Sequence, residues 1–276
     1  MRTGHRWAAG LLALAVLAAA GGGCGGDATG PAPGPAERAA AFLEAHLDQA
    51  DAPTQVLAAR LGERHGVGGF ERWGDTGRVR LAAPTPVDGR YAPAWSRLVD
   101  PAATVPPGTL DALPHTEPLE RISWVPATAL HCDTPAFPAD WMATARRALD
   151  DDPEAGYVTT HVGLGLVALA ELGCDPPGAA ELRRDTVAAL RSALAGTDRV
   201  DDLTLERVVV LAELDPATPV DPVWGERIAV AQRPDGGFGR NGPDDPAGSD
   251  WHTTLLAWWV LALLDGRGSD RPLFRP

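Results

Sequence analysis

The C-terminal half of the chain alternates between two kinds of helical segment. Three segments carry their apolar residues on one face, and three others are apolar on nearly all sides. A helix with one apolar face lies at the surface, whereas a helix that is apolar all round has to be enclosed by other helices. In chain order, beginning with an amphipathic one, the six segments are 140–149, 157–172, 181–194, 203–214, 222–232 and 251–264. The alternation predicts an all-α fold with an outer and an inner layer of helices.

Two of the apolar segments begin with related sequences. Tyr157 is followed by Val-Thr-Thr and His161, and Trp251 is followed by His252 and two threonines, with a stretch rich in Leu and Ala after each. The two stretches lie about 90 residues apart, which is the length of two repeats of helical pairs. We therefore expect His161 and His252 to occupy equivalent places near the starts of two inner helices.

A glycine-rich turn joins the last two helical segments. The first segment ends in Gln232, and residues 235–239 read Asp-Gly-Gly-Phe-Gly, where glycine permits a positive φ. This arrangement resembles one repeat of the α/α-toroid proteins, a superfamily that includes terpene cyclases and the β subunits of protein prenyltransferases. The matching residues cover roughly an eighth of the chain. The resemblance implies an incomplete α/α toroid, because a full ring has about five to seven helical pairs and this chain supplies about four.

The N-terminus has the composition of a secretion signal over residues 1–23. A short basic region precedes an apolar run that is too short for a comfortable membrane span, and small residues follow. Residues 21–24, Gly-Gly-Gly-Cys, resemble a bacterial lipobox, although Gly21 stands where an aliphatic residue is usual. The resemblance implies a lipid on Cys24 and a flexible tether over 24–36, and a plain signal peptide is the alternative. The protein is then expected outside the cytoplasm, anchored by lipid to the bacterial cell membrane or outer membrane.

The remaining two cysteines, Cys132 and Cys174, are predicted to pair. In an exported protein a disulfide is the usual state of two cysteines. Two zinc thiolates are the competing interpretation, but the chain has no Cys-x-x-Cys spacing.

Residues 37–121 are expected to form an N-terminal helical pair followed by an irregular segment. Helical periodicity is present over 37–65. From residue 66 the pattern breaks, and eight prolines lie between Pro84 and Pro118. The segment 66–121 is therefore predicted to be irregular, with a possible short hairpin over 69–81. Residues 122–276 are assigned to the toroid-like helical repeats.

Composition excludes several classes of function. The chain contains no lysine, so it has neither a Schiff-base lysine nor a P-loop lysine. Its formal net charge is −13 with no basic cluster, which argues against nucleic acid as a partner and against binding to anionic lipid headgroups.

The best candidates for a shared site are His161, His252, Tyr157 and Asp250, which would lie at the mouth of the inner helices. Two interpretations stay open: the histidines contribute to a ligand site, or they cap helix N-termini as neutral imidazoles. The residues around His252 are similar to the prenyltransferase segment whose histidine binds zinc. The Asp-x-Cys pair that this family also needs is absent, so neither a metal nor another cofactor is predicted.

Other catalytic signatures are weak. Terpene cyclases of the squalene–hopene type protonate an alkene from an Asp-x-Asp-Asp segment, and the nearest acidic runs here are 150–152 and 201–202. The first is expected to be a solvated turn and the second a helix start, where carboxylates favour the helix dipole. No Gly-x-Ser-x-Gly or His-Glu-x-x-His motif occurs. Trp251, Trp258 and Trp259 suit either a sugar-binding groove or a core, and a core is preferred.

The sequence therefore favours a non-catalytic lipoprotein of the cell envelope that uses a helical scaffold for binding. The alternative is an enzyme of the α/α-toroid type, directed at an isoprenoid or a polysaccharide, with its site at the mouth of the inner helices. A fold alone does not choose between these hypotheses, because one fold hosts many functions. Neither hypothesis identifies the ligand, substrate or protein partner.

Overall fold

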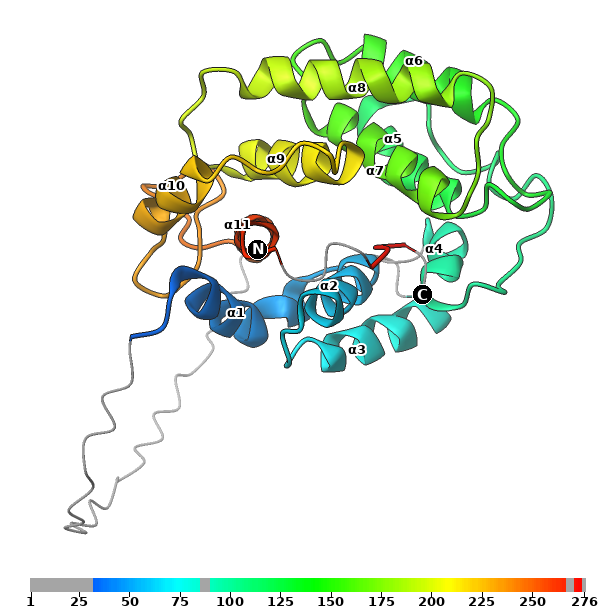
Figure 1. Ribbon diagram of the computed structural model, residues 1–276. Coiled ribbons are helices and arrows are strands. Elements are labelled where there is room, and N and C mark those ends of the chain that lie inside the picture. The colour runs from blue at the N-terminus through cyan, green and yellow to red at the C-terminus, as the bar shows by residue number, and fades with distance from the viewer. Residues whose placement is uncertain (1–31, 85–89, 267–270, 275–276) are drawn as a thin grey trace, which may run out of the picture. The chain divides into compact units, whose positions relative to one another are not determined.

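The computed structural model describes residues 32–84, 90–266 and 271–274, and in these residues the chain is all-helical (Figure 1). No strand occurs in this part of the chain beyond an isolated antiparallel bridge between Phe238 and Asp250. The helices belong to the unit Pro33–Pro276. They are α1 Pro35–His46, α2 Ala52–His65, α3 Glu71–Ala82, α4 Ala92–Val99, α5 Pro118–Ala129, α6 Trp141–Asp150, α7 Tyr157–Glu171, α8 Ala179–Leu194, α9 Asp202–Leu214, α10 Val223–Ala231 and α11 Trp251–Leu264.

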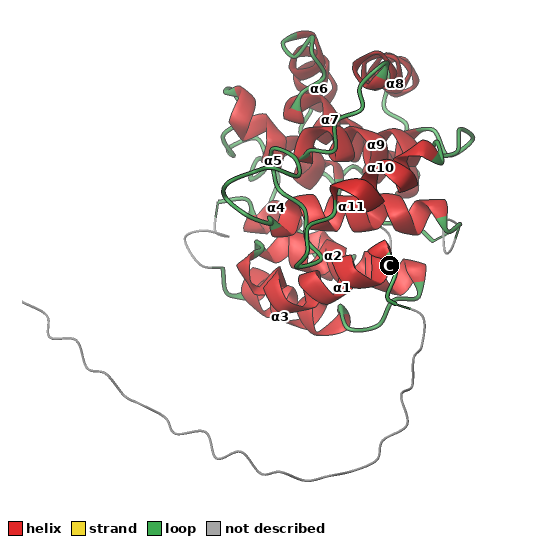
Figure 2. Ribbon diagram, turned by 90° about the vertical axis from the view of Figure 1, so that its left-hand side faces the viewer, coloured by secondary structure: helices red, strands yellow, loops and turns green. Residues whose placement is uncertain are grey.

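The predicted alternation of enclosed and half-exposed helices is confirmed. Helices α5, α7, α9 and α11 contact one another in that order, and α6, α8 and α10 pack against them. In both ribbon views α6 and α8 lie on one side of α7 and α9, whereas α1, α2 and α3 lie beyond α11 on the other side (Figures 1 and 2). The all-round apolar surface of α11 is buried, because α1, α2, α9 and α10 all contact this helix.

Helix α7 packs closely against α5 and α9 because glycines face both neighbours. A Cβ atom at Gly163 would lie 2.4 Å from Cγ1 of Val210 on α9, and one at Gly165 would lie 2.9 Å from Cγ1 of Val125 on α5. Real Cβ atoms do not approach other atoms so closely, so these two positions require glycine. The short α7–α9 distance brings the side chains of these two helices together at their N-terminal ends.

The N-terminal half contains more helix than the sequence suggested. The helical pair predicted over 37–65 is confirmed as α1 and α2. The hairpin over 69–81 is wrong, since α3 forms there. The predicted irregular segment 66–121 is interrupted by α3, α4 and the start of α5, whereas residues 100–117 are irregular as predicted. The glycines that obscured α3 are needed for contact with α2. A Cβ at Gly74 would lie 2.8 Å from that of Ala59, and one at Gly77 would lie 2.7 Å from the carbonyl oxygen of Ala52.

The Asp-Gly-Gly turn ties α10 to the start of α1. The side chain of Gln232 donates to the carbonyls of Pro35, at 2.9 Å, and Gly236, at 2.8 Å, and accepts from the guanidinium of Arg38. Gly236 has a φ of +88°, which favours glycine. A side chain there would also lie within 2.6 Å of the Arg38 carbonyl oxygen. The motif thus holds the end of α10 against the start of α1, which lies far away in the sequence.

The sulfurs of Cys132 and Cys174 lie at bonding distance, 1.95 Å, so the predicted disulfide is present. The bond joins the residues that follow α5 and α7. The predictions of a signal peptide over 1–23 and of a lipid on Cys24 lie outside the described residues. In the part of the chain that is described, no helix combines the length and apolar character needed to cross a bilayer.

Candidate functional site

A cavity of about 240 Å³ lies among the helices and holds both of the predicted histidines. Helices α2, α4, α5, α7, α9 and α11 line it together with the C-terminal segment. Its aromatic walls are Trp95, Trp251, Trp259 and Phe274. Its polar groups include His161, Glu206 and His252, which come from three different helices. The cavity is therefore apolar over much of its wall, with a group of titratable side chains at one place.

Asp202, at the start of α9, accepts hydrogen bonds from three side chains. His252 Nδ1 lies 2.9 Å and Thr253 Oγ1 2.7 Å from one carboxylate oxygen, and the hydroxyl of Tyr157 lies 2.7 Å from the other. The Asp202 side chain is 2 % exposed, whereas that of His252 is 34 % exposed. A buried carboxylate needs such partners to remain charged. Asp202 therefore has a donor on each of its oxygens.

Glu206 lies one turn further along α9 and has only one of its two oxygens bound. Oε1 accepts from Thr160 Oγ1 and lies 3.1 Å from His161 Nδ1. Oε2 is buried and has no hydrogen-bond partner. The side chain is 4 % exposed and lines the cavity. Glu206 is therefore a buried carboxylate with an open acceptor next to an internal space, and such a group calls for a structural or functional explanation.

Electrostatics favour charged forms of the Asp202–His252 pair. Burial by itself lowers the pKa of His252, but the hydrogen bond to Asp202 and the charges of Asp202, Glu206 and Asp250 raise it to about 9. Burial raises the pKa of Asp202, yet the bond and charge of His252, with Thr253 and Tyr157, lower it to about 2. Near neutral pH the pair is therefore an imidazolium and a carboxylate.

Two neighbouring groups also have shifted pKa values. Burial raises the pKa of Glu206, but the charges and hydrogen bonds of His161, His252 and Thr160 outweigh it, so the net direction is downward and Glu206 is ionised. Burial and the hydrogen bond to Asp202 raise the pKa of the Tyr157 hydroxyl. Tyr157 is therefore a hydrogen-bond donor here and not a phenolate.

The same cluster contains groups that could bind a metal ion. One possible ligand atom from each of Asp202, Glu206 and His252 lies within 4.8 Å of the others. Two carboxylates and an imidazole suit a divalent transition ion. Tyr157 and Thr253 would orient Asp202, and Thr160 and His161 would orient Glu206, as outer groups do around metal ligands. No metal was predicted from the sequence, since the Asp-x-Cys pair of the prenyltransferase zinc site is absent.

The structure brings most of the sequence candidates together. His161 and His252 both line the cavity, and Tyr157 is linked to His252 through Asp202. Asp250 caps α11 by accepting from the backbone and hydroxyl of Thr253. It joins the same network but is not among the residues that line the cavity.

Sequence reasoning missed the two carboxylates that organise the site. The prediction that Asp201 and Asp202 start a helix is confirmed, since Asp201 caps α9 and Asp202 is its first residue, but Asp202 also binds side chains from α7 and α11. Glu206 was not singled out. Two glutamates in the apolar run 203–214, Glu206 and Glu213, were the available signal, since an ionised side chain in an enclosed helix needs a specific partner.

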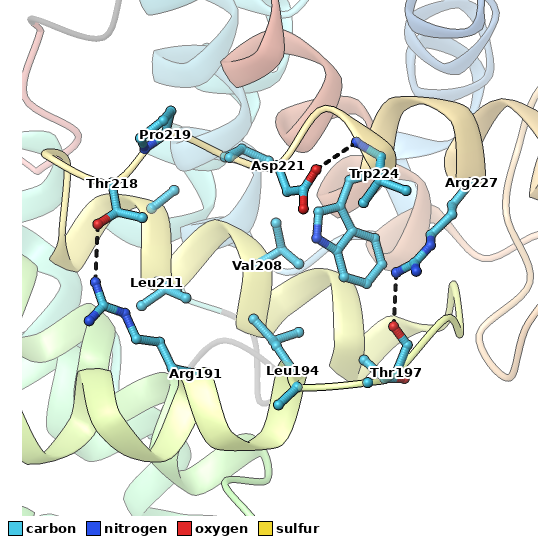
Figure 3. Close-up of a pocket in the computed structure, with 15 residues that line it drawn as sticks. Arg191, Leu194, Thr197, Val208, Leu211, Thr218, Pro219, Asp221, Trp224 and Arg227 are labelled. Atoms are coloured by element: carbon cyan, nitrogen blue, oxygen red, sulfur yellow. Dashed lines mark hydrogen bonds between the residues drawn. The ribbon is translucent and has the colours of Figure 1, made fainter.

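Another hollow lies between α8, α9 and α10 and has a volume of about 410 Å³ (Figure 3). Its polar side chains are bound to the protein itself. Arg191 donates to Thr218 Oγ1 at 3.0 Å, and Arg227 donates to the carbonyl of Thr197 at 2.8 Å and stacks on Trp224. Both arginines hold neighbouring elements together, so this hollow gives weaker grounds for a site than the cavity does.

No family model, curated protein or solved structure matches this chain. The site is therefore interpreted from its own geometry.

Proposed function

We propose that this protein is a lipid-anchored protein of the bacterial cell envelope whose helical domain binds a small ligand in the internal cavity. The signal-like N-terminus and Cys24 support export and anchoring. Incorporation of labelled palmitate that is lost in Cys24→Ser would test the anchor. The domain is an incomplete α/α toroid in this proposal, and the ordered contacts of α5, α7, α9 and α11, with α6, α8 and α10 packed against them, support it.

The observation that carries the binding function is the open oxygen of Glu206. A buried and unpartnered carboxylate oxygen costs stability, and folded proteins retain few such groups. Here the group borders a cavity with four aromatic residues in its walls. Apolar walls with a small number of placed polar groups are the usual composition of a small-molecule site.

Two valines of α9 give a matched test of cavity binding. Val209 lines the cavity and its neighbour Val208 lines the hollow of Figure 3, and both are buried. We would screen fragment-sized compounds against the full-length protein by tryptophan fluorescence and thermal shift. Compounds that bind wild type should also bind Val208→Phe but not Val209→Phe, because the added ring fills the cavity. Equal binding by both variants would locate the ligand elsewhere.

An enzyme is the second candidate, and the spacing of Asp202, Glu206 and His252 favours it. Three protein ligands beside an open space are the arrangement of many catalytic metal sites. Elemental analysis of protein purified without chelator tests this candidate. About one divalent ion per chain in wild type, lost in His252→Ala, would support it. Metal-free protein that binds no added ion would leave ligand binding as the function.

A further inference from the structure

We propose that the ligand of this cavity is a protonated amine with a small apolar body, and that its ammonium group binds Glu206 Oε2. The inference deepens the proposed function and rests on it, since it assumes that the cavity is the binding site. It follows from the different states of the two carboxylates on α9 and from the walls around them.

Asp202 and Glu206 differ in how many of their oxygens are bound. Asp202 has donors on both oxygens, from His252, Thr253 and Tyr157. Glu206 has its donors on Oε1, while Oε2 is buried without a partner. The missing component at this site is thus one hydrogen-bond donor on the cavity side. An ionised carboxylate binds a charged N–H donor more strongly than a neutral donor.

The walls favour a cation over a neutral donor. Trp95, Trp251, Trp259 and Phe274 line the cavity, and aromatic rings, tryptophan above all, attract cations through their electron-rich faces. The carboxylate of Glu206 would repel an anionic ligand, whereas the charge of His252, which also lines the cavity, is already paired with Asp202. The formal charge of −13 on the whole chain acts in the same direction at longer range.

The hydrogen bonds favour an ammonium group over a metal ion. A metal held by all three groups would have to break or share the 2.9 Å bond between His252 Nδ1 and Asp202 Oδ1, or turn the imidazole. An ammonium group can donate one of its three N–H groups to the open oxygen of Glu206 and direct the others at the aromatic walls, so the bond between His252 and Asp202 stays in place. One observation, the single open acceptor, therefore matches a ligand with a single charged donor group.

The volume limits the apolar body of the ligand. A cavity of about 150 Å³ is enough for benzene, and this one has about 240 Å³. One six-membered ring with a short alkylamine chain therefore fits.

The experiment compares 2-phenylethylamine with 2-phenylethanol, which has nearly the same shape but no charge. Calorimetric titration of the full-length protein at neutral pH should show the amine binding at least about tenfold more tightly than the alcohol. In Glu206→Gln this preference should disappear. Glu213→Gln is the matched control, because it removes a different buried carboxylate from the same helix, and it should keep the preference.

Each outcome decides between specific conclusions. Equal affinity for amine and alcohol in wild type would overturn the ammonium assignment while cavity binding stands, and this comparison does not depend on any variant folding. If neither compound binds, and no other one-ring amine or alcohol binds either, the assignment is overturned together with the proposed cavity function. Stoichiometric Zn²⁺ or Mn²⁺ binding that depends on Glu206, without amine binding, would assign the open oxygen to a metal instead.

Discussion

Helix α9 carries two buried glutamates two turns apart, and their surroundings differ. Glu213 forms a closed pair with Arg64, whose guanidinium nitrogen lies 3.0 and 3.1 Å from its two oxygens. Both side chains are nearly inaccessible, at 7 % and 6 % exposure. Glu206, equally buried, keeps one oxygen open beside the cavity. The same residue type on the same helix is thus a structural pair at one end and an open acceptor at the other.

The hydrogen-bond partners and pKa directions of the two glutamates distinguish a structural charge from a functional one in an enclosed helix. Burial and the charge of Glu171 raise the pKa of Glu213, and Arg64 opposes this shift without cancelling it. The pKa of Glu206 is lowered, because two histidines and a threonine outweigh burial. Glu213 contributes to stability only as part of its pair. Glu206 remains charged because the neighbouring histidines stabilise its carboxylate, while its unpartnered oxygen is left available to a ligand.

The largest effect is expected from breaking the closed pair. Arg64→Leu leaves Glu213 buried without its guanidinium partner, so the free energy of unfolding should fall by about 3–5 kcal/mol, measured by urea denaturation. The double variant Arg64→Leu/Glu213→Leu should regain most of this loss, because no uncompensated charge remains. A single variant within about 1 kcal/mol of wild type would contradict the structural role of the pair.

A medium effect is expected at the α7–α9 contact that positions His161 beside Glu206. Gly163→Ala places a methyl group 2.4 Å from Cγ1 of Val210, and overpacking of this kind typically costs about 1–3 kcal/mol. The loss should appear although alanine favours a helix. Gly225→Ala is the control, since its Cβ would meet its nearest neighbour at 3.3 Å. Thermal unfolding that is unchanged in Gly163→Ala would show that the two helices can move apart freely.

The charged pair of Asp202 and His252 should make the free energy of unfolding depend on pH. His252 has a folded-state pKa of about 9 against 6.5 for the free side chain. Its contribution is therefore complete below about pH 6.5 and is lost as the pH rises through about 9. For Asp202, with a pKa of about 2 against 3.8, the contribution is complete above about pH 4 and is lost as the pH falls through about 2.

Chemical denaturation between pH 6 and pH 10 measures the upper limb of this dependence. Wild-type stability should decline over that interval relative to His252→Gln, which cannot titrate at this position. If the free energy of unfolding changed equally with pH in the two proteins, His252 would not hold its proton more tightly in the folded state than in the unfolded state.

The smallest change in stability is expected at the open carboxylate. Glu206→Gln keeps an oxygen for Thr160 and His161 but removes the negative charge that the two histidines stabilise, so the free energy of unfolding should fall by about 1 kcal/mol or less. A loss as large as that of Arg64→Leu would mean that Glu206 is a structural ion and would weaken the contrast between the two ends of α9.

Local patterns in the sequence predicted much of the fold. The helices from α6 onward, the pair α1 and α2, and the disulfide followed from hydrophobic period, turn glycines and cysteine number. The helix over 71–82 did not, because Gly74 and Gly77 weaken the local helical signal and are explained only by the close approach of α2. In the candidate site, His161, His252 and Tyr157 were predicted from the repeated segment, whereas Asp202 and Glu206 were not assigned to it.

The sequence by itself determined that residues 140–264 form helices that alternate between half-exposed and enclosed, since both properties depend on the spacing of apolar residues along the chain. It also predicted equivalent helix positions for the two histidines, and this was wrong, since His161 is the fifth residue of α7 whereas His252 is the second of α11. Only the tertiary structure decided that Asp202 meets His252 and Tyr157, and that Glu206 faces a cavity with one oxygen open. The physical reason is that hydrogen bonds and burial depend on distances between residues far apart in the chain, which the packing of α7, α9 and α11 sets.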